Sequence, residues 1–261
     1  MSEKHTDSID EKTDFSDAIK TLEKGLSVLS AREGASDYVA SPYFAEQLTG
    51  LMMLVLERNE SIDLTSITEP KEFVRLHLLD SLACVGLPEV NKAIRLIDVG
   101  CGAGFPGLPL AALYPEKHFL LIDSLRKRIE FVDYAVKELN LKNVEVRHLR
   151  AETAGRDTEL REQFDLCLCR AVGKMSTILE YSMPFVRVGG SGIFYKTVPA
   201  EGEIQDSLIA RQHLGCSDFV RIETYKDILP ERRHALYIVE KSRVMDGKYP
   251  RREGVPSRVP L

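Results

Sequence analysis

The sequence lacks the features that mark secreted and membrane proteins. It has no run of about 18 apolar residues, the length that a transmembrane helix requires. Residues 1–20 are polar and acidic, without the apolar stretch of a signal peptide. The five cysteines form neither a CxxC pair nor a Cys/His ligand spacing, so we predict no disulfide framework and no metal site. We therefore expect a cytoplasmic protein with reduced thiols and no contact with a membrane.

An excess of positive charge is also missing. The 261 residues carry a formal net charge of −5, which does not by itself favour a nucleic-acid-binding protein. The charge is unevenly spread, because residues 1–40 are acidic and residues 241–261 are basic. A local basic patch can hold phosphates on an acidic protein, so the composition leaves RNA binding open. With 44% hydrophobic residues, the chain can form one substantial core.

Hydrophobic periodicity divides the chain into four segments. We expect a polar acidic tail or accessory helix at residues 1–38, with a weak helical stretch near Ala18–Leu29, and a helical cap at residues 39–90. The cap is expected to end in one helix over Lys71–Val85. Residues 91–241 are predicted to form an α/β domain, and residues 242–261 a basic irregular tail.

The third segment alternates short apolar runs with helical stretches. This alternation is typical of βαβ units and indicates a doubly wound, mainly parallel sheet. The last two runs are too close for a parallel crossover, so we expect an antiparallel last strand. One intervening helix is predicted over Arg126–Leu139. The expected strands are Arg95–Val99, His118–Ile122, Val144–His148, Asp165–Cys169, Gly192–Lys196, Phe219–Glu223 and Ala235–Glu240.

A glycine-dense turn follows the first predicted strand. Gly100, Gly102, Gly104 and Gly107 separate that strand from an expected helix. Glycines let a ligand approach the main chain closely, and the start of the helix offers N–H groups without intrahelical partners. The turn therefore predicts a small-molecule site at the carboxyl end of the strand.

Two cofactor classes fit this turn. The G-x-G-x-x-G spacing over Gly102–Gly107 is compatible with a nicotinamide dinucleotide. Asp98 inside the strand and Pro106 at the helix start disfavour that class. The G-x-G-x-G spacing from Gly100 suits S-adenosylmethionine, whose ammonium Asp98 would meet directly or through water. Asp123, after the second strand, suits the ribose hydroxyls of either cofactor, so a nicotinamide-dependent oxidoreductase stays the alternative.

Several separate blocks together resemble one protein family. They are Asp63–Ile67, His77–Ser81, Gly104–Gly107, Asp123–Leu125, Lys127–Arg128, Arg150–Glu152, Arg170–Ala171, Tyr195–Lys196 and Pro250–Pro256. They resemble the bacterial small-subunit ribosomal RNA guanine-N7 methyltransferases, also called the glucose-inhibited division protein B family. The resemblance runs from about Leu51 to the C-terminus. The chain departs from the family pattern at Asp63, Leu76, Cys169 and Thr197.

The resemblance implies a Rossmann-like methyltransferase sheet that binds S-adenosyl-L-methionine. It implies cofactor contacts at Gly100, Phe105, Ala151, Glu152 and Arg170, all at carboxyl ends of predicted strands. The turn itself adds Gly102, Asp98 and Asp123 to the expected cofactor site. The implied partner is small-subunit ribosomal RNA, free or within the ribosomal subunit, and we expect a monomer.

Two basic residues that end predicted strands are candidates for positioning the reacting groups. Arg170 closes the fourth strand and Lys196 the fifth, beside the expected point of methyl transfer. Either cation could instead form a structural salt bridge. His77 and Asp80 on the cap helix fit an RNA contact and a packing contact equally well. The basic tail, with Lys248, Arg251, Arg252 and Arg258, fits an extended RNA-binding arm or a solvated end.

Two other kinds of acceptor, pyrimidine C5 and exocyclic amines, are disfavoured by what the predicted fourth strand does not carry, and guanine N7 is the acceptor that the resemblance implies. Cys167 and Cys169 have no Pro-Cys turn of a C5 methyltransferase, and no Asn-Pro-Pro-Tyr turn grips an exocyclic amine. Guanine N7 has a free lone pair, so its methylation needs alignment rather than a general base, with the sulfonium supplying the chemistry. A small-molecule or protein methyltransferase and a non-catalytic RNA-binding scaffold remain alternatives.

Overall fold

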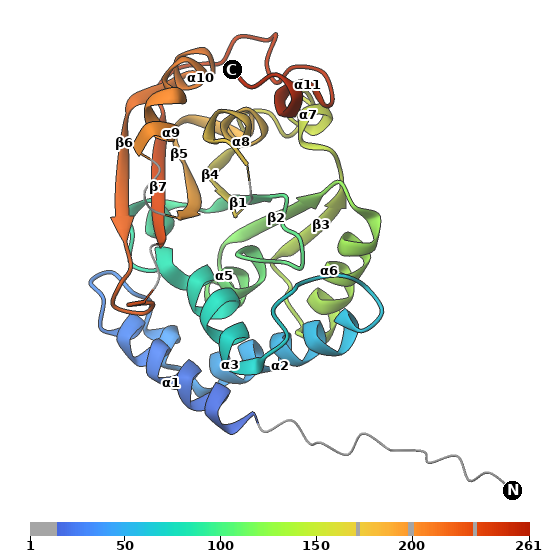
Figure 1. Cartoon of the computed structure of the whole chain (residues 1–261), viewed down its shortest axis with the longest axis vertical. Coiled ribbons are helices and arrows are strands. Elements are labelled where there is room, and N and C mark those ends of the chain that lie inside the picture. Colours follow the sequence, from blue (N-terminus) through green and yellow to red (C-terminus); the bar gives the residue numbers. More distant parts are fainter. Residues whose placement is uncertain (1–14, 171–172, 198–200, 232–233) are drawn as a thin grey trace, which may run out of the picture.

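The computed structural model describes residues 15–170, 173–197, 201–231 and 234–261. In this part of the chain, one seven-stranded sheet lies between two sets of helices (Figure 1). The strands are β1 (Arg95–Val99), β2 (His118–Asp123), β3 (Val144–His148), β4 (Phe164–Cys169), β5 (Val186–Thr197), β6 (Cys216–Thr224) and β7 (His234–Lys241).

The helices alternate with the strands and precede them at the N-terminus. The α-helices are α1 (Ser16–Ser30), α2 (Pro42–Asn59), α3 (Pro70–Phe73), α4 (Pro88–Lys92), α5 (Gly107–Leu113), α6 (Arg126–Glu138), α7 (Ala151–Ala154), α8 (Met175–Ser182), α9 (Glu201–Asp206), α10 (Leu208–His213) and α11 (Val255–Arg258). Two 3-10 turns, η1 (Asp37–Ala40) and η3 (Leu82–Cys84), and a π-helical turn, η2 (Val74–Leu79), complete the description. No helix in the described residues is long and apolar enough to cross a membrane.

The strand order is β3-β2-β1-β4-β5-β7-β6. Strands β1 to β5 pair in parallel, and β7 runs antiparallel to both β5 and β6. The predicted doubly wound sheet with an antiparallel last strand is therefore confirmed. The chain order reverses between β1 and β4, and open α/β sheets bind ligands beyond the carboxyl ends of strands at such a point.

Alternation along the central strands divides the core between the two faces of the sheet. In β1, Leu96 packs into the cluster formed with α1, α2 and α5, whereas Ile97 and Val99 pack into the cluster formed with α8 and α10. Successive strand residues point to opposite faces, so each apolar run supplies both layers. Buried strands of this kind read as continuous apolar sequence, which is why the sequence located them well.

The N-terminal helices share the core of the sheet. In α1, Ala18, Leu22, Leu26 and Leu29 are buried at helical spacing and belong to the same cluster as Leu96 of β1. Of the two expectations for residues 1–38, the structure therefore has the accessory helix, which extends the cap. Residues 1–14 lie outside the described residues.

The second cap helix differs from its prediction. A single helix was expected over Lys71–Val85, but the chain forms α3, then the π-helical turn η2, and then the 3-10 turn η3. The apolar positions continue through all three pieces, with Val74, Leu78 and Leu82 buried, so periodicity alone predicts one continuous helix. The widened turn η2 faces the candidate site, where the Leu76 carbonyl accepts a hydrogen bond from Arg170.

Candidate active site

A cavity of about 550 Å³ lies at the carboxyl ends of β1, β2, β3 and β4. Its walls are the turn after β1, the turn after β2, the start of α7 and the end of β4, with further side chains from the cap and from α8. Its size is that of cavities which hold small molecules and cofactors. The predicted site residues that line it are Gly100, Gly102, Phe105, Asp123, Ala151, Glu152 and Arg170.

The turn after β1 presents bare backbone to this cavity. Gly100 and Gly102 have φ angles of +75° and +57°, and a Cβ placed on either glycine would meet no atom within 4 Å. Residues with side chains rarely adopt these angles. The two glycines thus leave room for a ligand against the main chain, which is the space that an adenosyl amino acid needs.

Asp123 holds the turn from the neighbouring strand. Its Oδ2 accepts a hydrogen bond from the Gly102 amide at 3.0 Å, and its Oδ1 accepts one from the Leu125 amide at 2.8 Å. Each carboxylate oxygen has a second lone pair, and Asp123 lines the cavity. The side chain can therefore fix the loop and still accept a ribose hydroxyl.

Asp98 occupies a different position from the one expected. Its side chain is completely buried and is not among the residues that line the cavity. Oδ2 accepts a hydrogen bond from the Gly107 amide at 2.8 Å, and Oδ1 has no hydrogen-bond partner in the described residues. Burial raises the pKa of this carboxyl to about 7. Asp98 thus ties the start of α5 to β1 from beneath the turn, and its contact with a ligand ammonium, directly or through water, stays a prediction.

Arg170 is held by the π-helical turn. One guanidinium nitrogen, Nη1, donates to the Leu76 carbonyl at 3.0 Å and to Asp80 Oδ2 at 3.1 Å. The other, Nη2, donates to His77 Nδ1 at 3.0 Å. Mid-helix π turns are frequent at functional sites, and here the turn places three acceptors around one guanidinium. The structural salt bridge and the position beside the cavity, considered as alternatives, both occur.

His77 is neutral in this arrangement. Burial, and then the charge of Arg170, lower its pKa to about 3. Because Arg170 donates to Nδ1, the proton sits on Nε2, which lies 2.7 Å from Thr65 Oγ1. The ring stacks on Phe105, with centroids 4.9 Å apart, so His77 links the cap to the turn after β1.

Asp80 completes the network on the side away from the cavity. Its Oδ1 accepts hydrogen bonds from the Tyr225 hydroxyl at 2.7 Å and from His234 Nδ1 at 3.1 Å. Burial alone would raise the pKa of Asp80, but these hydrogen bonds and Arg170 hold it below its usual value. The cap, β4 and the β6–β7 hairpin therefore meet at one buried carboxylate.

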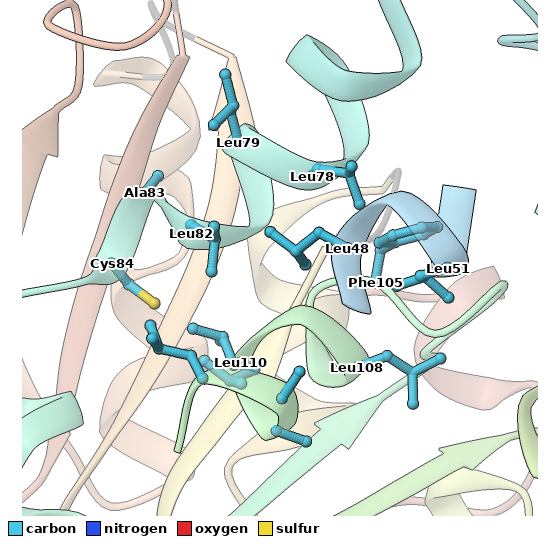
Figure 2. Packing of buried hydrophobic residues seen from close by; sticks show 14 of the residues in the cluster. Leu48, Leu51, Leu78, Leu79, Leu82, Ala83, Cys84, Phe105, Leu108 and Leu110 are labelled. Carbon is cyan, nitrogen blue, oxygen red and sulfur yellow. The ribbon is translucent and has the colours of Figure 1, made fainter. Parts of the chain in front are cut away.

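Phe105 is an anchor for the turn as well as part of the cavity wall. Figure 2 shows its ring beside Leu48 and Leu51 of α2 and near Leu78 of η2. The side chain is 4% exposed, and the guanidinium of Arg170 lies 5.3 Å from the ring centroid. Its position fixes the turn and Arg170 relative to each other.

Lys196 lies away from the cavity. Its Nζ donates to the Gly173 carbonyl and to Glu203 Oε1, both at 2.7 Å, and it is not among the lining residues. These bonds tie the end of β5 to α9 and to the segment after β4. Lys196 therefore forms structural contacts here, and its positioning role next to the methyl-transfer point stays a prediction.

The basic C-terminal tail also differs from its prediction. It is irregular apart from α11, as expected, but it is docked on the protein through the buried Met245, Tyr249 and Pro256, whereas Lys248, Arg252 and Arg258 stay exposed. Arg251 donates to Glu180, a fully buried carboxylate of α8, through Nε at 2.9 Å and Nη2 at 2.6 Å. The positive charge of Arg251 is thus already neutralised inside the protein by Glu180.

Sequence reasoning overlooked several lining residues. They are Leu64 of the cap, Ser124, Leu125 and Arg128 after β2, Leu149 and Arg150 after β3, and Ile178 and Tyr181 of α8. Those after β2 and β3 immediately follow the ends of parallel strands, a position that marks ligand contacts in this architecture. Ile178 and Tyr181 have no such signal, because they enter the cavity wall only through the packing of α8.

Comparison with known proteins gives a consistent result. Residues 45–222 match the GidB family, described as rRNA small subunit methyltransferase G. The chain is 40% identical over 219 residues to ribosomal RNA small subunit methyltransferase G of Alkaliphilus metalliredigens, covering 83% of this chain and 90% of the relative. It is 39% identical over 243 residues to the protein of the same name from Thermoanaerobacter pseudethanolicus, covering 91% of this chain and all of the relative.

Proposed function

Because the chain belongs to the GidB family of rRNA small subunit methyltransferases, we propose that it transfers a methyl group from S-adenosylmethionine to N7 of a guanine in small-subunit ribosomal RNA. The observation that carries the proposal is the open space against Gly100 and Gly102 at the β1/β4 switch point. An adenosyl amino acid without a pyrophosphate fits a turn of this kind.

The cofactor would be held along the carboxyl ends of β1, β2 and β3. Gly100 and Gly102 would face its amino-acid part, Asp123 its ribose hydroxyls, and Ala151 and Glu152 its adenine. When bound, its sulfonium supplies an activated methyl group. The chain's own contribution is to keep the ligand in one orientation and to exclude water from one side of it.

The acceptor side of the site would be formed by Arg170 and its neighbours. Guanine N7 attacks with its own lone pair, so the chain needs no group that removes a proton, and correct alignment of the reacting atoms supplies most of the catalysis. Arg170 has a fixed direction through Leu76, His77 and Asp80. A guanidinium held in this way can orient a base or a phosphate beside the methyl group.

The RNA backbone would approach over the first turn of α6. Arg126 and Lys127 are exposed there, Arg128 lines the cavity, and none of the three pairs with a carboxylate of the described residues. Three cations in a first turn oppose the helix dipole. That local cost supports a role in holding phosphates, which position RNA without reading its sequence.

A transfer assay with tritiated S-adenosylmethionine tests the proposal. Small ribosomal subunits that lack the modification, free small-subunit RNA, ribosomal protein and a small-molecule extract would be offered in parallel. We expect label in RNA only, and none with Gly100→Val, because a β-branched side chain fills the space beside the backbone. Label in protein or small molecules would favour the other acceptors, and binding of NAD instead of S-adenosylhomocysteine would favour an oxidoreductase.

A further inference from the structure

The C-terminal segment of residues 249–258 packs against both short helices that border the cavity on one side. On α8, Glu180 is completely buried and accepts hydrogen bonds from the Arg251 amide at 2.7 Å and from its guanidinium. Thr177 of the same helix donates to the Pro256 carbonyl at 3.0 Å. A buried carboxylate left without its cation is strongly unfavourable, so docking of the segment and the structure of α8 depend on each other.

The same segment holds a side chain that lines the cavity. The Gly254 amide donates to Glu152 Oε1 at 3.0 Å, and Glu152 of α7 is 6% exposed. On the neighbouring residue, Thr153 Oγ1 donates to Glu253 Oε1 at 2.7 Å. Oε2 of Glu152 has no hydrogen-bond partner in the described residues. One oxygen of the carboxylate is therefore fixed by the tail, and the other stays available to a ligand.

We propose that residues 249–258 form part of the cofactor site, with Gly254 and Arg251 as positioning residues that orient Glu152 toward the adenine amine of the bound ligand. This inference rests on the proposed function, because it assigns the cavity to an adenosyl ligand. The tail contributes no atom to the ligand contact itself. It fixes the acceptor that distinguishes adenine from a purine with a carbonyl at position 6.

Coupling of this kind works in both directions. If the docked tail strengthens ligand binding, ligand binding must strengthen tail docking by the same factor. The Gly254 amide reports on the docked state directly, because its hydrogen bond to Glu152 exists only there. A tail that merely covers the surface would leave this amide unaffected when the cavity is filled.

Hydrogen exchange on the full-length protein, with and without S-adenosylhomocysteine, tests the coupling without any substitution. We expect the Gly254 amide to exchange about tenfold more slowly at saturating ligand. Amides of β6, on the far edge of the sheet, serve as the internal control. Unchanged exchange at Gly254 with ligand bound would overturn the inference.

Calorimetry on two truncated chains tests the same coupling from the ligand side. Truncation after Pro250 removes Arg251 and Gly254, whereas truncation after Arg258 removes only the last three residues. We expect the first to weaken S-adenosylhomocysteine binding about tenfold or more and the second to leave it within about twofold. The full-length protein should also prefer S-adenosylhomocysteine over S-inosylhomocysteine, and truncation after Pro250 should reduce that preference.

The outcomes separate the two proposals. If the full-length protein binds no S-adenosylhomocysteine, the proposed function fails and this inference fails with it. If the full-length chain and the chain that ends at Pro250 bind it equally and with the same adenine preference, only the inference fails. If truncation after Pro250 unfolds the protein, as judged by circular dichroism, the exchange of the Gly254 amide decides the question.

Discussion

The first turn of α6 and the C-terminal tail carry similar clusters of positive charge, but the structure uses them in opposite ways. In the tail, Arg251 is bound to the buried Glu180, Lys248 pairs with Asp246, and Arg258 donates to the backbone. The cations over Arg126–Arg128 form no ion pair with the described residues. The comparison shows that positive charge in the sequence does not by itself identify a phosphate-binding segment, because the fold can neutralise that charge, as it does at Arg251.

The free-energy cost of placing these cations also differs between the tail and α6. Arg251 and Glu180 lose hydration on burial, and their hydrogen-bonded ion pair offsets that loss. The fold therefore depends on keeping this pair intact. The α6 cations keep their water and oppose only the helix dipole, a penalty below about 1 kcal/mol each. The same contrast extends to Arg170, whose guanidinium is held by three acceptors of the cap.

The largest effect is expected on removing the buried tail cation. Arg251→Met should lower the free energy of unfolding by about 3–5 kcal/mol, because Glu180 is left buried without its cation and keeps only the hydrogen bond from the backbone amide of residue 251. Urea unfolding measures this loss. Arg252→Met is the matched control, since it removes the same charge from an exposed neighbour. Equal losses in the two variants would show that the Arg251 pair has no special role.

The next effect concerns pH and the network around Arg170. The pKa of His77 is lowered to about 3, so between pH 6.5 and pH 3 the unfolded chain binds a proton that the folded chain does not. Stability from neutral His77 is complete above pH 6.5 and is lost as the pH falls toward 3. Between pH 7.5 and pH 5 this loss amounts to about 2 kcal/mol.

Urea unfolding of the wild type and of His77→Gln at both pH values isolates this contribution. The wild type should lose about 2 kcal/mol more than the variant. The raised pKa of Asp98 acts with the opposite sign in this range, but it contributes equally to both proteins. Parallel losses would mean that burial and the charge of Arg170 do not keep His77 neutral in the folded protein.

A smaller effect is expected on neutralising the free cations of α6. The triple variant Arg126→Gln, Lys127→Gln, Arg128→Gln should raise KM for small subunits about tenfold and flatten its salt dependence by about 2–3 log units per log unit of salt. Its free energy of unfolding should not fall, because the removed charges oppose the helix dipole. An unchanged salt slope would place the RNA on another surface.

The smallest effect is expected from the exposed tail cation. Lys248→Gln breaks a surface pair with Asp246, whose side chain is 57% exposed, and a cation–π contact with the Tyr249 ring, and such exposed contacts contribute little. KM for small subunits should stay within about twofold of the wild type, and the free energy of unfolding within about 0.5 kcal/mol. If the salt dependence of KM became as flat as in the α6 variant, the tail would contribute to RNA binding as much as α6 does.

The sheet could be predicted well because its information is local. Apolar runs mark β1 and β3 to the residue and most other strands closely, and the glycine turn identifies which edge binds a ligand. β5 is longer than expected, since it begins at Val186 and runs through three glycines before the apolar stretch. Strand pairing, rather than sequence pattern, defines that beginning.

The site could be predicted only where its residues follow strand ends. Asp98 and Asp123 were both expected at the cofactor, but one is beneath the turn and the other lines the cavity, because Asp98 lies inside β1 whereas Asp123 ends β2. The partners of Arg251 and Gly254 lie 71 and 102 residues away along the chain. No local pattern reveals that a basic tail will neutralise a buried carboxylate, so its charge alone pointed to RNA.

The identity of the methylated nucleoside directly tests whether the protein methylates guanine N7 in small-subunit ribosomal RNA. Small subunits without the modification would be incubated with the protein and S-adenosylmethionine, and their RNA digested and analysed by mass spectrometry. We expect 7-methylguanosine as the new nucleoside, absent when Gly100→Val replaces the wild type. A methyl group recovered in another nucleoside, or no methylated nucleoside from a protein that binds S-adenosylhomocysteine, would contradict this expectation.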